Sequence, residues 1–439
     1  MTVPMSVIYC GRIAHLRESP FRRQKALEII ETGALLVSNI GRVLALGERR
    51  DLIGVHPEAA RVDFGDAWLI PGLVDGHIHF PQYYATAAHG RQLMDWLERS
   101  IFPAEVAYAD AEFAQQAATD FIHQLLGCGT TTAMAFGSQF LYASLALFDA
   151  AKLAGIRLIS GMTLMDRSGP DALLQSPEQA RDGVQRLIER CRDEALLHYA
   201  ITPRFALSCS PAMLEACGSL LKRHPECYVQ THINESLAEV EAVSRDFPGT
   251  QHYLEVYDRF GLVGERTLLA HDIHVTELEL LRMAEAGCAV CHCPSSNLYL
   301  GSGLFPLARH VEFGVPVAIG TDIGAGTHFS VWEELSEAYK IQQLQGMTLG
   351  AAELLYLATL GGAEALRLAD EVGNFRPGKS ADFVVIEVDG YLKKRLQYCS
   401  SLEDQLFCLL HLATAAQVHA TYVAGRRVWP YSNHGITNQ

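Results

Sequence analysis

The middle of the chain alternates short, continuous runs of apolar residues with longer segments that are apolar along one face only. Short apolar runs bounded by turn residues indicate buried strands, whereas apolar residues three and four positions apart indicate amphipathic helices. Helical spacing is clear over Ser176 to Leu197, Pro211 to Arg223 and Val275 to Ala286. Strands alternating with helices in this way predict the α/β class, as a (β/α)8 TIM barrel. The predicted strands are residues 67–76, 130–136, 156–162, 199–207, 227–233, 267–272, 288–292 and 315–321.

The two ends of the chain carry a different pattern, in which short β-like runs are separated by glycine and by charged turns. A helical segment, Ser401 to Gln417, interrupts the C-terminal runs. The simplest arrangement brings both ends together, so we expect a composite β-sandwich domain from residues 1–66 and 375–439, and the barrel from residues 67–374. The β-like runs are Ser6 to Tyr9, Ala34 to Val37, Val43 to Leu46, Ala381 to Ile386 and Val418 to Val428.

Composition narrows the class of protein. The chain has 439 residues, of which 49% are hydrophobic, and a formal net charge of −15. Such an acidic surface argues against nucleic acid and anionic membranes as partners. Neither a membrane-length apolar run nor a signal-peptide pattern is present, so we expect a cytoplasmic protein. The eleven cysteines, including Cys291 and Cys293, are then expected to be reduced and packed.

Residues that suit a metal site follow several of the predicted strands. His77 and His79 stand two positions apart at the end of the first strand, so their side chains share one face. His232, His271 and Asp322 follow the fifth, sixth and eighth strands. In a (β/α)8 barrel the C-terminal ends of the strands meet at one face, where active sites lie. We therefore expect these five residues to converge.

Imidazoles together with a carboxylate and a position for water suit a zinc-type ion. Zinc lowers the pKa of its bound water from about 15.7 to about 7, which makes hydroxide available at neutral pH. His271 fits either of two roles, as a metal ligand or as a hydrogen-bond partner of the bound water. Asp322 can both bind the metal and accept a proton from the water.

Other polar and aromatic residues near the same strand ends suit a planar, nitrogen-rich substrate. Glu235 can carry protons to a ring nitrogen and to a leaving amine, or it can simply open the next helix. Arg204 fits a carbonyl oxygen or an ordinary ion pair, and Phe205 fits a planar ring or the core. Gln82, whose amide both donates and accepts, fits a nucleobase edge or a solvated loop. Trp96 lies in a long segment that could cover the site, and it fits the substrate or the core equally.

Together these motifs resemble the amidohydrolase superfamily. The resemblance rests on PGLVDGHIH at residues 71–79, on the later His, His and Asp, and on ADFVVIEVD at residues 381–389. Within the superfamily the chain is similar to the guanine deaminases. The motifs that carry this closer resemblance are HFPQ at 79–82, MDWL at 94–97, FPAE at 102–105, TPRF at 202–205, HINE at 232–235 and CPSSN at 293–297. The last of these could line a pocket or simply end a strand.

The resemblance implies a role for each candidate residue. One zinc ion per chain, with Fe2+ as the alternative, is expected on His77, His79, His232 and Asp322. No lysine stands at the end of the fourth strand, where two-metal relatives bridge their ions, so a single ion is expected. The expected catalytic residues are Glu235 as the proton shuttle, His271 on the hydrolytic water, and Asp322. The expected substrate contacts are Gln82, Trp96, Arg204, Phe205 and Glu235.

The implied reaction is the hydrolytic deamination of guanine to xanthine and ammonia by a zinc-bound hydroxide, a step of purine catabolism. We expect a small purine as the substrate, neither nucleic acid nor membrane as a partner, and a homodimer. The nearest alternative is a related deaminase that acts on 8-oxoguanine, a pterin, cytosine or a triazine. The alternative of another class is a non-catalytic scaffold relative, against which the retention of every ligand position argues.

Overall fold

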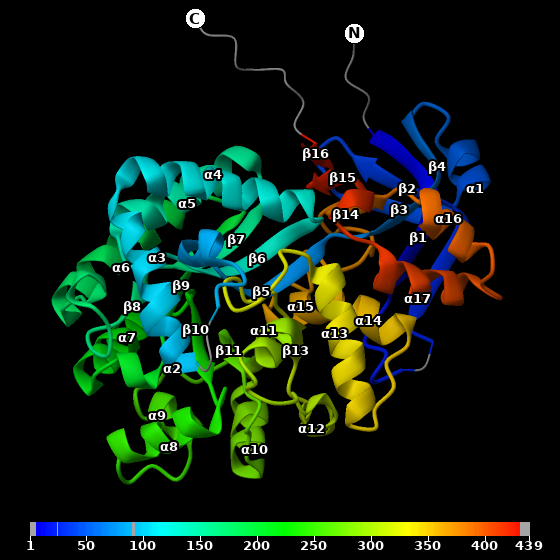
Figure 1. Cartoon of the computed structure of the whole chain (residues 1–439). Coiled ribbons are helices and arrows are strands. Elements are labelled where there is room, and N and C mark those ends of the chain that lie inside the picture. Colours follow the sequence, from blue (N-terminus) through cyan, green and yellow to red (C-terminus); the bar gives the residue numbers. More distant parts are fainter. Residues whose placement is uncertain (1–5, 24, 90–92, 431–439) are drawn as a thin grey trace, which may run out of the picture.

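Eight parallel strands close into a barrel at the centre of the molecule (Figure 1). The structure is a computed structural model and describes residues 6–23, 25–89 and 93–430. Strand β13 lies beside β5, and the short strand β8 (Thr163–Leu164) pairs with β9. The barrel strands in order are β5 (Leu73–His79), β6 (Thr130–Phe136), β7 (Arg157–Gly161), β9 (Leu197–Pro203), β10 (Tyr228–Ile233), β11 (Thr267–His271), β12 (Ala289–His292) and β13 (Val317–Ile319).

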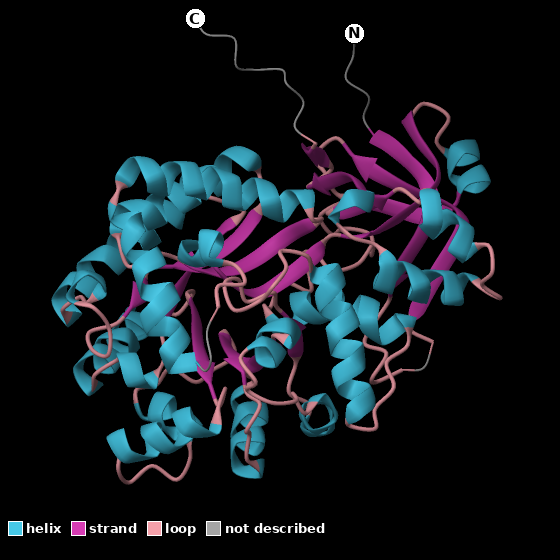
Figure 2. Ribbon diagram, viewed as in Figure 1, coloured by secondary structure: helices cyan, strands magenta, loops and turns pink. Residues whose placement is uncertain are grey.

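Helices cover the outside of the barrel (Figure 2). Residues of β5, β6 and β7 are buried along their whole length, as expected of parallel strands covered on one side by helices and on the other by the barrel interior. This arrangement confirms the predicted fold class. The helices that follow the barrel strands are α4 (Ala111–Gly127), α5 (Leu141–Ala154), α6 (Pro177–Cys191), α7 (Pro211–Arg223), α8 (Leu237–Asp246), α9 (Tyr253–Arg259), α10 (Glu277–Ala286), α11 (Pro294–Tyr299), α12 (Leu307–Phe313), α13 (Val331–Leu344), α14 (Ala351–Ala358) and α15 (Leu360–Ala365).

Local sequence signals set where several of these helices begin. Ser176 accepts a hydrogen bond from the backbone of Gln179, whose side chain bonds back to Ser176, and this capping box starts α6. Thr276 and Glu279 form the same arrangement at the start of α10. Because the caps satisfy backbone N–H groups that have no partner within the helix, they stabilise the start of each helix at these residues.

The two ends of the chain meet in a second sheet beside the barrel, as the sequence predicted (Figure 1). Phe383 stacks on Tyr422 with ring centroids 4.3 Å apart, and Tyr9 packs edge-on against Phe383 at 5.0 Å, so N- and C-terminal strands share one aromatic core. Helices α1 (Arg49–Val55), α16 (Gly390–Leu396) and α17 (Leu402–Leu412) belong to these end regions. The strand order in this sheet is β16 (Arg426–Trp429), β15 (Val418–Val423), β14 (Phe383–Ile386), β4 (Ala60–Pro71), β1 (Ser6–Leu16), β2 (Leu27–Ser38) and β3 (Val43–Glu48).

Gly72 is the point at which the chain passes from the terminal sheet into the barrel. The sequence predicted one strand over residues 67–76, but the structure divides this stretch between β4 and β5. The backbone N–H of Gly72 donates to the carbonyl of Asp382, at 2.9 Å, whereas Leu73 already bonds to Gly129 at the barrel side. A Cβ on Gly72 would lie 2.0 Å from Oγ1 of Thr131, so only glycine fits this crossing. His77 and His79 therefore lie within the first barrel strand.

A long connection between β5 and β6 crosses the mouth of the barrel. Its short helical turns carry the HFPQ, MDWL and FPAE motifs, although the side chain of Met94 lies outside the described residues. None of the described helices is both long and apolar enough to cross a membrane. The turns are η1 (Phe80–Ala85), α2 (Leu93–Trp96), η2 (Leu97–Ile101), α3 (Phe102–Val106) and η3 (Ala107–Ala109).

Candidate active site

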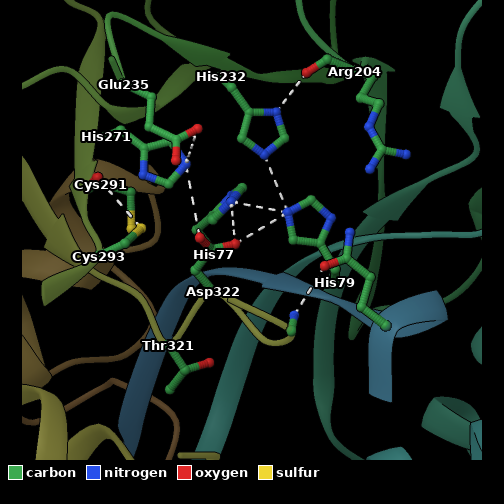
Figure 3. A network of polar contacts seen from close by, with 12 residues as sticks. His77, His79, Arg204, His232, Glu235, His271, Cys291, Cys293, Thr321 and Asp322 are labelled. Carbon is green, nitrogen blue, oxygen red and sulfur yellow. Dashed lines mark hydrogen bonds and ion pairs between the residues drawn. The ribbon is translucent and has the colours of Figure 1, made fainter. Parts of the chain in front are cut away.

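Three histidines and one aspartate meet at the C-terminal ends of the barrel strands (Figure 3). His77 and His79 come from β5, His232 comes from β10, and Asp322 follows β13. Nε2 of His79 lies 3.2 Å from Nε2 of His77 and 3.1 Å from Nε2 of His232. Oδ1 of Asp322 lies 3.1 Å from Nε2 of His77 and 3.2 Å from Nε2 of His79. All four side chains offer a donor atom to one common point.

The chemistry of these donors fits a divalent metal ion. Burial lowers the pKa of His79 to about 4 and the pKa of His232 well below its usual value, so both imidazoles are neutral at pH 7. Nδ1 of His232 donates to the carbonyl oxygen of Arg204, at 2.5 Å, which leaves the lone pair on Nε2. A tetrahedral zinc site with bonds of about 2.0–2.1 Å has donor–donor edges of roughly 3.3 Å, close to the distances found here.

Several strand ends at the site have strained backbones. Asn234, His271 and Asp322 have φ angles of 50°, 76° and 47°, in the left-handed region that costs such residues on the order of 1–3 kcal/mol. The backbone N–H of Asp322 donates to the carbonyl of His77 at 2.8 Å, and the side chain of Asn234 donates to Asp272 at 2.8 Å. These bonds hold the turns that aim the side chains inward.

Glu235, His271 and Asp322 form a second cluster beside the histidines (Figure 3). Nε2 of His271 lies 3.6 Å from Oε2 of Glu235 and 3.8 Å from Oδ2 of Asp322. Burial, together with the nearby charge of Asp322, raises the pKa of Glu235 to about 8. Burial alone would raise the pKa of Asp322, but His77 and its neighbours hold it well below its usual value. The cluster thus pairs a carboxylic acid, Glu235, with a carboxylate, Asp322.

Asn297 fixes the orientation of His271. Nδ1 of His271 donates to Oδ1 of Asn297 at 2.9 Å, so Nε2 of His271 carries the lone pair that faces Glu235 and Asp322. Sγ of Cys293 also lies near His271 and Asp322, but burial raises the pKa of this thiol well above its usual value and keeps it protonated. A protonated thiol is a poor ligand, and Cys293 remains the packed residue that was expected.

One cavity receives nearly all of the predicted site residues. Trp96 and Phe205 lie in the wall of this cavity, and each has only a few per cent of its surface exposed. Trp96 also donates from Nε1 to the carbonyl of Ala88 at 3.0 Å, so it packs in the wall as well as facing the space. The lining consists of His79, Gln82, Leu93, Trp96, Leu97, Arg204, Phe205, His232, Glu235, His271, Leu300, Asp322 and Ala325.

Gln82 and Arg204 are both held by a residue that lies behind the cavity wall, Glu105. The carboxylate of Glu105 accepts from Nε2 of Gln82 at 2.9 Å and from Nη1 of Arg204 at 2.6 Å. Oε1 of Gln82 accepts from the backbone N–H of Gly324 at 3.0 Å. The Arg204 guanidinium also lies over the ring of Phe102, with Cζ 5.2 Å from its centroid. Arg204 therefore forms the ion pair that was one of its two expected roles, and it also lines the cavity; its contact with a carbonyl oxygen stays a prediction.

Sequence reasoning assigned no role to Glu105 or Asn297. Glu105 stands in the FPAE motif and Asn297 in the CPSSN motif, so each lay inside a segment that resembled the family. A buried carboxylate in a short helical turn leaves no periodic signal, and neither does a buried amide. Their roles become visible only in the contacts that they make with Arg204 and His271, which are distant in sequence.

Comparisons with known proteins agree with this geometry. The Amidohydrolase family matches residues 68–428. Guanine deaminase of Escherichia coli (strain K12) is 43% identical over 417 residues, which cover 94% of both chains. The solved structure of E. coli guanine deaminase has a TM-score of 0.93 at 41% identity, and it covers 96% of this chain and 99% of its own. Guanine deaminase from C. acetobutylicum, solved with guanine in its active site, has a TM-score of 0.89 at 26% identity and covers 96% and 99% of the two chains. The chain therefore belongs to the amidohydrolase family and, within it, to the guanine deaminases.

Proposed function

We propose that this protein hydrolyses guanine to xanthine and ammonia at the cavity described above, with one zinc ion on His77, His79, His232 and Asp322. The observation that carries the proposal is the meeting, in one buried cavity, of a metal-binding donor set, a raised-pKa carboxyl group and two side chains that suit a purine edge. The relatives named above support guanine as the substrate. A zinc ion bound there supplies a Lewis acid that lowers the pKa of a water molecule to about 7.

The chain's own residues supply the proton transfers. Oδ2 of Asp322 and Nε2 of His271 face each other at 3.8 Å and can hold and accept a proton of the attacking water. Glu235 enters as the protonated acid, because its pKa is raised to about 8, and donates to the ring nitrogen next to the attacked carbon. The Glu235 carboxylate then takes the proton that remains on the added hydroxyl and delivers it to the departing amine, and the proton accepted by Asp322 or His271 returns to Glu235. Water and guanine thus become xanthine and ammonia with no net proton lost or gained.

Substrate orientation falls to Gln82, Arg204 and Phe205. The guanidinium of Arg204 is a fixed fork of donors, which suits the carbonyl oxygen at C6 of guanine. The amide of Gln82 presents donor and acceptor to the mixed edge of the base. Phe205, with 4% of its surface exposed, packs on the flat ring. This orientation brings C2 and its amino group toward the histidines and Glu235.

A substrate panel tests the proposal directly. The purified protein is analysed for bound metal, and ammonia release is measured with guanine, 8-oxoguanine, a pterin, cytosine and a triazine. We expect about one zinc per chain and the highest kcat/KM with guanine. Higher efficiency with any of the other bases would overturn the guanine assignment, and a metal-loaded protein that releases no ammonia from any of them would favour a scaffold role. The cytoplasmic location and the homodimer remain predictions, and light scattering of the purified protein tests the dimer.

A further inference from the structure

Glu105 is a buried carboxylate at the meeting point of three side chains from separate parts of the fold. It lies on α3 with only 1% of its surface exposed and does not line the cavity. Its carboxylate accepts from Gln82 at 2.9 Å, from Arg204 at 2.6 Å and from Gln139 at 2.6 Å. Burial alone would raise the pKa of Glu105, but the charge and hydrogen bond of Arg204, together with the hydrogen bond of Gln139 and the charge of His79, lower it. Glu105 is therefore a charged partner for the arginine.

The charge of Glu105 changes what Arg204 can recognise. A lone buried guanidinium would favour an anionic oxygen, because its charge has little water to screen it. With Glu105 at 2.6 Å, the pair is neutral as a whole, yet the remaining N–H groups of Arg204 keep their direction. A neutral pair of this kind suits a neutral carbonyl oxygen, as guanine carries at C6, rather than an oxyanion.

Glu105 also decides which way the amide of Gln82 points. Nε2 of Gln82 donates to Glu105, and Oε1 of Gln82 accepts from Gly324. A carboxylate only accepts, so the nitrogen of Gln82 has to face Glu105. The two residues proposed to read the purine edge thus share one partner, Glu105, which does not line the cavity and whose hydrogen bonds go to Gln82, Arg204 and Gln139.

We propose that Glu105 is the positioning residue that makes this cavity select a neutral purine over an anionic one, by fixing Gln82 and by compensating the charge of Arg204. The proposal rests on the proposed function of the cavity. A purely structural ion pair would affect stability only. The proposal instead requires that loss of the Glu105 charge change the relative affinity for neutral and anionic purines, and that this change depend on Arg204.

Glu105→Gln is the direct test, because it keeps the shape and removes the charge. The new amide cannot accept at both oxygens, so a donor would face either Gln82 or Arg204. Gln139→Met is the matched control, since it removes one donor to Glu105 but leaves the carboxylate on Arg204. Each protein is assayed for KM and kcat with guanine, and for the inhibition constant of urate, a purine that is anionic at pH 8.

For Glu105→Gln we expect KM for guanine to rise by about tenfold or more, and the ratio of the urate inhibition constant to that KM to fall by at least about tenfold. For Gln139→Met we expect this ratio to stay within about twofold of the wild type. In the double variant Glu105→Gln with Arg204→Met, the preference for urate should disappear, because the uncompensated cation is gone. An unchanged ratio in Glu105→Gln, or an equal shift in the double variant, would overturn the proposal.

Two measurements keep this test separate from the proposed function and from folding. Calorimetric binding of guanine and urate gives the same ratio even if the wild type releases no ammonia from guanine, which would refute the function alone. If Glu105→Gln does not fold, the preference between guanine and urate is measured in Glu105→Asp and in the double variant, and these two proteins test the proposal. We expect Glu105→Asp, which keeps the charge, to retain the wild-type preference for guanine over urate, and a shift toward urate in this variant would contradict the role of charge.

Discussion

His232 and Arg204 are joined by a hydrogen bond of 2.5 Å from Nδ1 of the imidazole to the main-chain carbonyl of the arginine. His232 is a metal-ligand candidate, and the side chain of Arg204 faces the cavity. The backbone of Arg204 therefore orients a candidate metal ligand, while its side chain lines the cavity proposed to bind the substrate. A shift of the β9 end would alter both functions together, because the two depend on the same peptide unit.

Removal of one histidine of the donor set should abolish metal binding. In His77→Ala or His232→Ala, the remaining donors bind an ion poorly, and nearly all ammonia release from guanine should be lost. Elemental analysis of the purified variants measures the metal content. His419→Ala, which changes an exposed side chain on strand β15 of the terminal sheet, serves as the control and should keep both metal and activity. Full metal content with normal turnover in His77→Ala would show that the site is elsewhere.

Glu235→Gln should separate metal binding from turnover. The amide keeps the size of the side chain but cannot shuttle a proton, so kcat should fall by roughly two to four orders of magnitude while the metal stays bound. Steady-state kinetics and metal analysis of the same preparation measure the two properties. Activity within a few-fold of the wild type would mean that Glu235 only opens helix α8.

Arg204→Ala should reduce activity most for a base that carries the C6 carbonyl. A site built around a donor penalises the loss of its acceptor partner, so we expect a larger drop in kcat/KM for guanine than for 2-aminopurine, which lacks the carbonyl. The comparison needs both bases on both proteins. Equal losses would mean that Arg204 does not contact C6.

Asn297→Ala should slow turnover without removing the metal. The variant removes the acceptor that fixes the imidazole of His271, and loss of such outer partners typically costs roughly 10–100-fold in activity. Ser296→Ala is the neighbouring control, because the buried hydroxyl of Ser296 has no hydrogen-bond partner among the described residues. Nitrogen chemical shifts of His271 report its tautomer. If Asn297→Ala keeps the wild-type tautomer and rate, the contact has no positioning role.

Lys379 should make stability depend on pH in the alkaline range. Burial lowers the pKa of this amine to about 8, with the charge of Arg376 as a further cause, against about 10.4 in an unfolded chain. Between these values the unfolded chain binds the proton and the folded chain does not, so unfolding becomes less favourable as the pH rises. Urea titrations at pH 7.5 and 9.5 measure this, with Lys379→Met as the reference. A constant difference between the two proteins would contradict the shift.

The sequence predicted the barrel and the metal donors because both depend on local pattern. Continuous apolar runs indicate buried parallel strands, and residues at their C-terminal ends converge whatever the connecting loops do. His77, His79 and Asp322 were therefore placed correctly at the mouth of the barrel. Their catalytic and binding roles still stand as predictions.

Features that depend on contacts between distant residues could not be predicted. At Gly72 the backbone changes partner from Asp382 in the terminal sheet to Gly129 at the barrel, and no local pattern reveals these distant partners. Glu105 is separated in sequence from Gln82 by 23 positions and from Arg204 by 99. Its contacts with them therefore form only when the end of β9 and the connection between β5 and β6 are packed together. The FPAE motif pointed to the segment but not to the carboxylate.

The crossing at Gly72 has a consequence for the order in which the protein is made. Strand β4 leads directly into β5 and its two histidines, yet its neighbour on one side is β14, where Phe383 pairs with Pro71. A ribosome adds roughly 5–20 residues per second, so β4 waits tens of seconds for this partner. Asp322, the last of the four donors, is synthesised during that wait. All four candidate metal ligands are thus synthesised before the terminal sheet, whose strand β4 leads into His77 and His79, can be completed.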